Sequence, residues 1–360
     1  MRVQFNAVLK DVTRKGTKIQ TDEYLTEGKF PIIDQGNNDI AGYRDDETGL
    51  FTDVPAIVFG DHTRIVKYIT EPFFLGADGV KVLVPIDRTM NCKYLYYQLL
   101  SAKIPDTGYN RHFKWVKELE FQLPSRNEQD DVVKRLDKLC VVISARQQQL
   151  AKLDELVKAR FVEMFGDISI NDKGWDVEPL GILCTIVRGA SPRPIEKYLG
   201  GDVPWIKISD ATHGENIYLN KTKEYIIQEG VSKSRKVKSG SLIFANCGVS
   251  LGFARIITFD GCIHDGWLAM EDIDERVNKI FLLQALNQMT EHFREIAPAG
   301  TQPNLNTTIM KEYKQIIPPM RLQEEFVGFI ERADKLRLQI EKSLEKSETL
   351  RKSLMQQYFG

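Results

Sequence analysis

The chain has 360 residues, 42% of them hydrophobic, and a formal net charge of −1, so it can form two or three domains with sizeable cores. No stretch approaches 18 consecutive apolar residues, and the first residues lack the apolar core of a signal peptide, so we expect a cytoplasmic protein without a membrane span. The near-neutral charge argues against a nonspecific DNA-coating protein, but it allows a basic surface on one face.

Cysteine and histidine usage argues against a metal or redox centre. The five cysteines form no CxxC pair, and the five histidines form no HxxxH or HExxH spacing. We therefore expect reduced, mostly buried thiols and no structural zinc site.

The first part of the chain predicts a mixed domain. Short β-branched or aromatic stretches bounded by Gly, Asp or Asn predict strands at 56–59, 65–69 and 80–85. Residues 91–102 are the stretch with a clear helical pattern.

A long helix is predicted over 123–166. Proline lies near its start, acidic residues fill the first turn and Gly166 ends it. Apolar residues recur at spacings of three and four, as in a coiled-coil seam. The seam consists of Val132, Leu136, Leu139, Ile143, Leu150, Leu153 and Val157.

The second part follows the same plan. Strands are predicted at 241–245 and 254–259, and a helix at 276–296. A second long helix is predicted over 317–360, with a less regular seam. That seam consists of Phe326, Ile330, Ala333, Ile340, Leu344 and Leu350. Both domains are therefore predicted to be α+β, each with a twisted, mainly antiparallel sheet.

The two long helices are repeats of one another at a constant offset of 194 residues. Identical pairs include Gln129 with Gln323 and Phe165 with Phe359. The domains repeat more faintly. Asn110 matches Asn304, and Asp78-Gly79 matches Asp265-Gly266. Phe30-Pro31-Ile32 resembles Val203-Pro204-Trp205-Ile206, and residues 94–100 match 280–286. The chain therefore divides into domain 1–122, helix 123–166, domain 167–316 and helix 317–360.

The simplest arrangement of the helices is an antiparallel pair, because a lone helix would leave its apolar stripe in water. Two separate oligomerisation helices are the alternative.

This plan resembles the specificity subunit of type I restriction–modification systems, in which two variable domains are each followed by a repeated helix. The second domain carries local motifs of that family: Trp175-Asp-Val-Glu-Pro-Leu180, Gly189, Pro192, Tyr198, Gly201-Asp-Val-Pro-Trp-Ile-Lys-Ile-Ser-Asp210, and Ala299-Gly-Thr-Gln-Pro-Asn-Leu-Asn306 before Ile317-Pro-Pro319. The first domain lacks the tryptophan–aspartate opening, so it is identified mainly by its place in the repeat.

The resemblance implies that each target-recognition domain reads one half of a split DNA target. It also implies that the helices dock two methyltransferase subunits, which bring S-adenosylmethionine and modify adenine. Restriction subunits, which use ATP and Mg, can join to cut unmodified DNA. Two different domains on one spacer suit an asymmetric target whose halves lie about one helical turn apart.

Polar loops of both domains supply candidate base contacts, because directional donors and acceptors read base edges. The candidates are Asn37, Asn38, Arg44, His62, Arg64, Asn110, Arg111, His112, Lys114, Arg188, Ser191, Arg193, Ser209, His213, Asn246, Thr301, Gln302 and Asn304. The loops at 109–114 and 301–307 rank highest, because they precede the long helices at equivalent places. Phosphate contacts are expected from lysines 221, 223, 233, 236 and 238.

Enzymatic signatures are missing from the sequence. It contains no methyltransferase Asn/Asp-Pro-Pro-Tyr/Phe motif and no Walker A loop, and no Asp/Glu-x-Lys follows Pro105-Asp106 within about 25 residues. His264, Asp265 and Cys247 could be imagined as a nucleophilic site, although Cys247 has no evident counterpart in the first domain. We therefore predict a non-catalytic chain without a cofactor of its own. The alternative from another class is a coiled-coil scaffold whose two domains bind proteins.

Overall fold

The computed structural model describes residues 1–212, 217–248, 250–298 and 303–360. The chain divides into two compact units. Unit 1 comprises Met1–Gln147 and Lys342–Gly360, and unit 2 comprises Gln148–Glu341. The division passes through both long helices, so neither helix is a domain by itself. Each unit therefore consists of one globular head and one half of each long helix.

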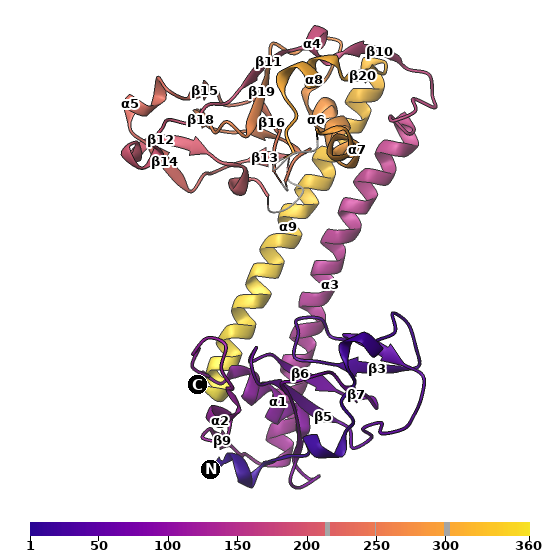
Figure 1. Cartoon of the computed structure of the whole chain (residues 1–360), viewed down its shortest axis with the longest axis vertical. Coiled ribbons are helices and arrows are strands. Elements are labelled where there is room, and N and C mark those ends of the chain that lie inside the picture. Colours follow the sequence, from indigo (N-terminus) through magenta and orange to yellow (C-terminus); the bar gives the residue numbers. More distant parts are fainter. Residues whose placement is uncertain (213–216, 249, 299–302) are drawn as a thin grey trace. The chain divides into compact units, whose positions relative to one another are not determined.

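The two long helices are α3 (Arg126–Phe165) and α9 (Met320–Phe359), each of 40 residues, which confirms both helix predictions (Figure 1). In unit 2 the two segments run antiparallel, because Arg337 of α9 pairs with Asp154, whereas Arg160, further along α3, reaches back to Glu325. The apolar seam predicted for α9 is buried at Phe326, Ile330, Ala333 and Ile340. The prediction is wrong at Leu350, which is 51% exposed.

The head of unit 1 contains three small sheets among its described residues. Its strands are β1 (Arg2–Gln4), β2 (Leu9–Asp11), β3 (Phe30–Ile33), β4 (Gly42–Arg44), β5 (Ala56–Gly60), β6 (Val66–Ile69), β7 (Phe74–Leu75), β8 (Val80–Pro85) and β9 (Glu120–Gln122). The sheet orders are β1-β9, β2-β8-β5-β6 and β4-β3-β7. Strand β5 is buried along its whole length because it lies between two neighbours, and helix α1 (Cys92–Ser101) packs on it, β6 and β8. Helix α2 (Phe113–Val116) precedes β9.

The head of unit 2 repeats this topology with additional strands. Its strands are β10 (Asp176–Pro179), β11 (Thr185–Arg188), β12 (Leu199–Ile206), β13 (Tyr218–Leu219), β14 (Glu224–Ile226), β15 (Arg235–Val237), β16 (Leu242–Ala245), β17 (Ala254–Ile257), β18 (Gly261–Ile263), β19 (Trp267–Glu271) and β20 (Lys314–Ile317). The sheet orders are β10-β20, β11-β19-β16-β17-β13 and β14-β12-β18-β15. Helices are α4 (Leu180–Leu183), α5 (Gln228–Val231), α6 (Lys279–Gln288), α7 (Thr290–Ile296) and α8 (Thr307–Glu312). Short 3₁₀ helices lie at Phe5–Ala7, Thr13–Lys15, Thr21–Glu23, Ile195–Lys197 and Ile208–Asp210.

The mainly antiparallel prediction is confirmed for the described strands, with parallel pairs at β3·β7, β12·β18 and β13·β17. However, each head divides its strands among three sheets instead of one. The match of Phe30-Pro31-Ile32 with Val203-Pro204-Trp205-Ile206 is also confirmed. Ile32 of β3 lies in a parallel pairing with β7, and Trp205 of β12 lies in the equivalent parallel pairing with β18.

The register predicted for the repeated short helix is wrong by one residue. Asn91 caps α1 and Asn278 caps α6, each accepting hydrogen bonds from two backbone N–H groups of the first turn. The offset between these caps is therefore 187, whereas the match of 94–100 with 280–286 has an offset of 186. The match of Asp78-Gly79 with Asp265-Gly266 also has an offset of 187.

The single helix predicted over 276–296 is two helices, α6 and α7, joined at Met289. Polar side chains beside the break bind the turn between β16 and β17 instead of continuing the helix. Asn287 accepts from the backbone N–H of Ala254 (2.6 Å), and the Thr290 hydroxyl donates to the Gly252 carbonyl (2.6 Å).

In each head, one glutamine at an equivalent position connects the head to the long helix that follows it. Gln129 of α3 accepts from the N–H of Asn91 (2.9 Å) and donates to the Pro124 carbonyl (2.9 Å). Gln323 of α9 accepts from the N–H of Asn278 (2.8 Å) and donates to the Pro318 carbonyl (2.7 Å). Each glutamine thereby holds the N-terminal cap of α1 or α6 against the start of a long helix.

Replacing Gln323 by alanine is expected to reduce the free energy of unfolding of unit 2 by about 1–3 kcal/mol, because the N–H of Asn278 and the Pro318 carbonyl lose their partner, a side chain that is 0% exposed. Urea unfolding followed by tryptophan fluorescence in a Trp115→Phe background measures this, since the other tryptophans lie in unit 2. The exposed Gln339 of the same helix provides the control, Gln339→Ala. Equal losses in the two variants would contradict the expected role of Gln323.

Candidate nucleic-acid interface

In each head, polar loops meet at one end of the central sheet. In unit 1, Asp61 follows β5 and its N–H donates to the carbonyl of Gly79, just before β8 (2.7 Å). In unit 2, Asn246 follows β16 and its N–H donates to the carbonyl of Gly266, just before β19 (3.0 Å). The loop that leads to α2 or α8 arrives at the same place. The two heads therefore share one framework at this sheet end.

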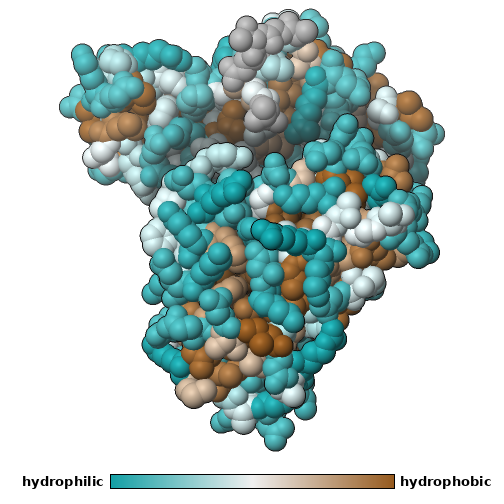
Figure 2. All heavy atoms as spheres, turned by 60° about the horizontal axis from the view of Figure 1, so that its bottom comes forward, coloured by the Kyte–Doolittle hydropathy of each residue, from teal (hydrophilic) through white to brown (hydrophobic). Residues whose placement is uncertain are grey.

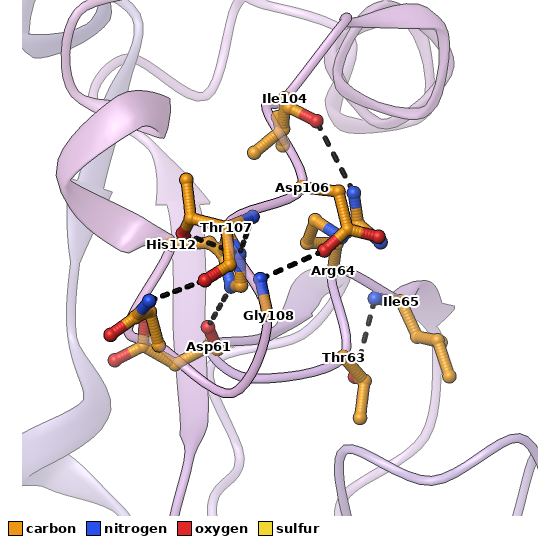
Figure 3. Close-up of polar contacts among 10 residues, drawn as sticks. Asp61, Thr63, Arg64, Ile65, Ile104, Asp106, Thr107, Gly108 and His112 are labelled. Carbon is orange, nitrogen blue, oxygen red and sulfur yellow. Dashed lines mark hydrogen bonds and ion pairs between the residues drawn. The ribbon is translucent and has the colours of Figure 1, made fainter.

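Asp61 fixes the loop before α2 in unit 1 (Figure 3). Its carbonyl accepts from the backbone N–H of His112 (2.7 Å) and from the His112 ring nitrogen Nδ1 (3.0 Å). Its carboxylate accepts from the N–H of Phe113 (2.7 Å). Asp61 is 4% exposed, so these bonds form out of water, where hydrogen bonds are electrostatically stronger.

Asn246 holds the equivalent loop, which precedes α8, in unit 2. Its carbonyl accepts from the N–H of Leu305 (2.8 Å), and its side-chain Nδ2 donates to the Leu305 carbonyl and to Asn304 Oδ1 (3.2 Å each). We call Asp61 and Asn246 the loop clamps. Both side chains are buried at equivalent positions directly after a central strand.

These contacts correct two of the predicted base contacts. His112 and Asn246 are both 0% exposed, so neither side chain can reach a base edge. Both residues instead hold the loops that present other side chains.

Arg64 braces the same loop of unit 1 at a second point. Its guanidinium pairs with Asp106 (2.6 Å) and donates to the Ile104 carbonyl (3.5 Å). The Gly108 N–H and the Arg64 guanidinium together hold the pKa of Asp106 below its usual range. Arg64 has a φ of 63°, an uncommon conformation that persists where the surroundings fix it.

Some of the other candidates of unit 1 have polar atoms bonded within the head, some are exposed, and Asn38 and Asn110 are both. Arg44 pairs with Asp46 (2.9 Å) and Glu23 (3.4 Å), and the Asn38 carbonyl accepts from the buried Lys67. His62 Nδ1 lies 3.2 Å from the Asn110 carbonyl, and the Asn110 amide donates to the Thr107 carbonyl. The exposed candidates are Asn37, Asn38, Asn110, Arg111 and Lys114. A role of any of these in base contacts stays a prediction.

In unit 2, Asp265 gathers three candidates. Its carboxylate accepts from the Ser191 hydroxyl (2.9 Å) and pairs with Arg193 (3.2 Å), and its carbonyl accepts from Arg188 (3.1 Å). The guanidinium groups of Arg188 and Arg193 lie on exposed residues. The structure therefore brings a basic pair to the turn before β19.

Ser209 is exposed and Asn304 is half-buried against Asn246. The lysines 221, 223, 233, 236 and 238 are all exposed, as phosphate contacts require. His213, Thr301 and Gln302 lie outside the described residues.

The histidine, aspartate and cysteine near this turn do not form an activated nucleophile. The Gly266 N–H donates to His264 Nδ1 (2.9 Å), which leaves Nε2 to face Asp265 (2.9 Å). Burial lowers the pKa of His264, whereas burial and the Asp265 charge raise the pKa of Cys247. The Cys247 sulfur is therefore held as a neutral thiol, which is a poor nucleophile.

The structure also supplies the counterpart that the sequence did not reveal for Cys247. It directly follows the clamp Asn246, as His62 directly follows the clamp Asp61. By the offset of 194 that relates the long helices, Pro303 corresponds to Tyr109 in the sequence, whereas the clamp bonds join His112 and Leu305, which are 193 residues apart. The shared framework thus carries different side chains at its tips.

No cluster of metal-ligating side chains and no helix long and apolar enough to cross a membrane occurs among the described residues. In the face drawn in Figure 2, hydrophilic residues cover most of the surface, with smaller hydrophobic areas between them.

The sequence pointed to the loops at 61–64 and 109–114 but did not single out Asp61 or Tyr109. Asp61 was not recognised as a clamp, although a polar residue directly after a buried strand in both halves is a usable signal. The sequence carries no comparable signal for Tyr109, whose exposure of 87% is visible in the structure.

Comparisons with known proteins agree on one family. The model of the family described as type I restriction modification DNA specificity domain matches residues 6–155 and 172–350. The type I restriction enzyme MjaIX specificity subunit of Methanocaldococcus jannaschii is 25% identical over 202 residues, which is 55% of this chain and 46% of that protein. The match therefore spans about half the length of that relative.

Two solved structures share the fold over the whole chain. The type I restriction-modification system S subunit from M. genitalium covers 100% of this chain and 96% of its own, with a TM-score of 0.60 and 18% identity. A chain from a structure of complex assembly and conformational transition of the type I R-M system covers 100% and 97%, with a TM-score of 0.61 and 13% identity.

Proposed function

The chain belongs to the type I restriction modification DNA specificity family, and from this premise we propose that it reads a split DNA sequence for a multi-subunit enzyme and is not itself an enzyme. One half of the target belongs to each head. The observation that carries this proposal is the pair of loop clamps, Asp61 and Asn246, which fix the same loop at the same sheet end in both heads.

Two heads that share a backbone framework but expose different side chains are suited to recognising two different DNA sequences. The clamps make the loops rigid, and rigid loops lose less entropy when they bind. The tips differ, with His62 and Tyr109 in one head and Cys247 and Pro303 in the other. Two such heads favour an asymmetric, interrupted target over a palindrome.

We further propose that the long helices dock two methyltransferase subunits. Exposed apolar side chains occur on the helices at positions related by the offset of 194. Val142 is 41% exposed and its counterpart Leu336 is 48% exposed, while Leu156 and its counterpart Leu350 are each 51% exposed. Burying these side chains against a partner would remove apolar surface from water, which favours association.

In each unit, one of these residues on α3 and one on α9 lie at nearly the same level of the two helices. In unit 2 the Asp154–Arg337 ion pair brings Leu156 and Leu336 to within a turn of the same level. In unit 1 the Arg135–Tyr358 hydrogen bond sets the register of the two helices. This register brings Val142 and Leu350 to within a turn of the same level. Two equivalent pairs suit two copies of one partner.

The partners supply the chemistry in this proposal. S-adenosylmethionine binds to the methyltransferase subunits, and ATP and Mg bind to two restriction subunits where these join the complex. The whole assembly works on DNA in the cytoplasm. The alternative is a scaffold whose heads bind proteins.

Methylome sequencing tests the function in cells. Deleting the chain should remove one split adenine-methylated motif, and re-expression should restore it. A chain in which another relative's domain replaces residues 1–122 should change one half of that motif and leave the other half intact. If no motif disappears on deletion and no DNA binds with a cognate methyltransferase present, the scaffold alternative holds. A change in both halves would contradict one head per half-site.

A further inference from the structure

Tyr109 has an unusual position for a tyrosine. It is 87% exposed at the tip of the loop before α2, and its ring stacks on that of His62 at 4.7 Å between centroids and 9° between planes. One face of the Tyr109 ring is thus covered by His62, and the other face is open.

The loop around Tyr109 is fixed on both sides. Before the tip, the Asp106 carboxylate accepts from the Gly108 N–H (3.1 Å) and pairs with Arg64. After the tip, His62 Nδ1 contacts the Asn110 carbonyl (3.2 Å), and the clamp Asp61 holds His112 (Figure 3). An exposed aromatic ring on such a braced loop is preorganised for a partner with a flat or apolar edge.

We propose that Tyr109 is a specificity-determining residue for the first half-site, and that its open ring face packs against the exposed edge of a DNA base. His62 is the positioning residue that holds the ring. The inference rests on the proposed function. In duplex DNA only base edges are open to the protein, and an apolar contact with such an edge, for example a thymine methyl group, needs no hydrogen bond. This contact therefore adds a mode of reading that polar loop residues lack.

The second head supports the assignment by contrast. Cys247 and Pro303 correspond to His62 and Tyr109, and the Gly248 N–H donates to the Pro303 carbonyl (3.2 Å). In the second head a backbone bond therefore holds the loop where His62 Nδ1 contacts the Asn110 carbonyl in the first, and no pair of rings occurs at Cys247 and Pro303. A ring contact in one head and not in the other makes the two half-sites chemically different.

Binding to DNA by the complex with the cognate methyltransferase tests the proposal. The probes are two fluorescent duplexes: one carries the split motif found by methylome sequencing, and the other has its first half scrambled. Tyr109→Ala should weaken binding to the motif duplex by about tenfold, with little change on the scrambled duplex. Tyr109→Phe should bind as the wild type does, because the ring faces remain.

The controls separate a ring contact from other roles. Ile86→Ala removes another exposed apolar side chain, 44% exposed, after the opposite end of β8, and should change nothing. His62→Ala should weaken the motif duplex less than Tyr109→Ala, and the double variant should lose no more than Tyr109→Ala alone, since His62 acts through Tyr109.

Three results would overturn the proposal: wild-type affinity of Tyr109→Ala, an equal loss on both duplexes, or a loss in Tyr109→Phe as large as in Tyr109→Ala. A wild-type complex that does not discriminate between the duplexes would instead refute the proposed function itself.

Discussion

Replacing Phe165 by alanine should reduce the free energy of unfolding of unit 2 by about 3–5 kcal/mol, because it opens a cavity in a fully packed core. Phe165 is 0% exposed at the end of α3. Its ring lies 4.8 Å from that of Phe281, 5.0 Å from Phe161 and 5.4 Å from Phe326, centroid to centroid. The cluster therefore joins both long helices to α6.

Urea unfolding in the Trp115→Phe background measures this loss, since Trp175 donates its indole N–H to the Phe165 carbonyl (2.9 Å) and reports on the cluster directly. Val162→Ala on the same helix is the control, because Val162 is 51% exposed. Phe359→Ala, at the equivalent position of unit 1, should leave this unit 2 signal unchanged. A loss below about 1 kcal/mol for Phe165→Ala would contradict the tight packing of the cluster.

Aspartate at both Leu156 and Leu336 should weaken the binding of one methyltransferase subunit by about a hundredfold or more, because two charges would be buried in an apolar contact. Native mass spectrometry of the purified complex should then find one methyltransferase copy in place of two. Adding Val142→Asp and Leu350→Asp should remove the second copy. All four side chains are exposed, so the fold should persist.

The matched control is Gln147→Asp with Gln339→Asp, which places the same charges at exposed polar positions of the same helices. This variant should retain two methyltransferase copies. Two copies in the fourfold aspartate variant would exclude the exposed apolar pairs as the docking surface.

The parts of the fold that could be predicted are those with a long periodic pattern. Both 40-residue helices follow from their repeat and their apolar spacing. The break at Met289 could not be predicted, because it depends on Asn287 and Thr290 bonding to a turn that is distant in sequence. The alignment of α1 with α6 was predicted one residue off. The apolar residues match at an offset of 186, whereas the caps Asn91 and Asn278 match at 187.

The candidate site was predictable to the level of loops and no further. The loops at 109–114 and 303–306 meet the clamps in both heads, so their shared importance was visible from position alone. Which side chains face solvent was not visible, because His112 and Asn246 are polar residues that the fold buries. Tyr109 is the reverse case, since an aromatic residue is usually expected in a core.

The division of the chain into units has a consequence for synthesis on the ribosome. Unit 1 includes residues 342–360, and its core is packed by Leu354, Met355, Tyr358 and Phe359. The first head to leave the exit tunnel therefore waits for a segment made nearly 200 residues later, while its apolar face stays open. Unit 2 is contiguous in sequence from Gln148 to Glu341, so the head made second is the first that can complete its core.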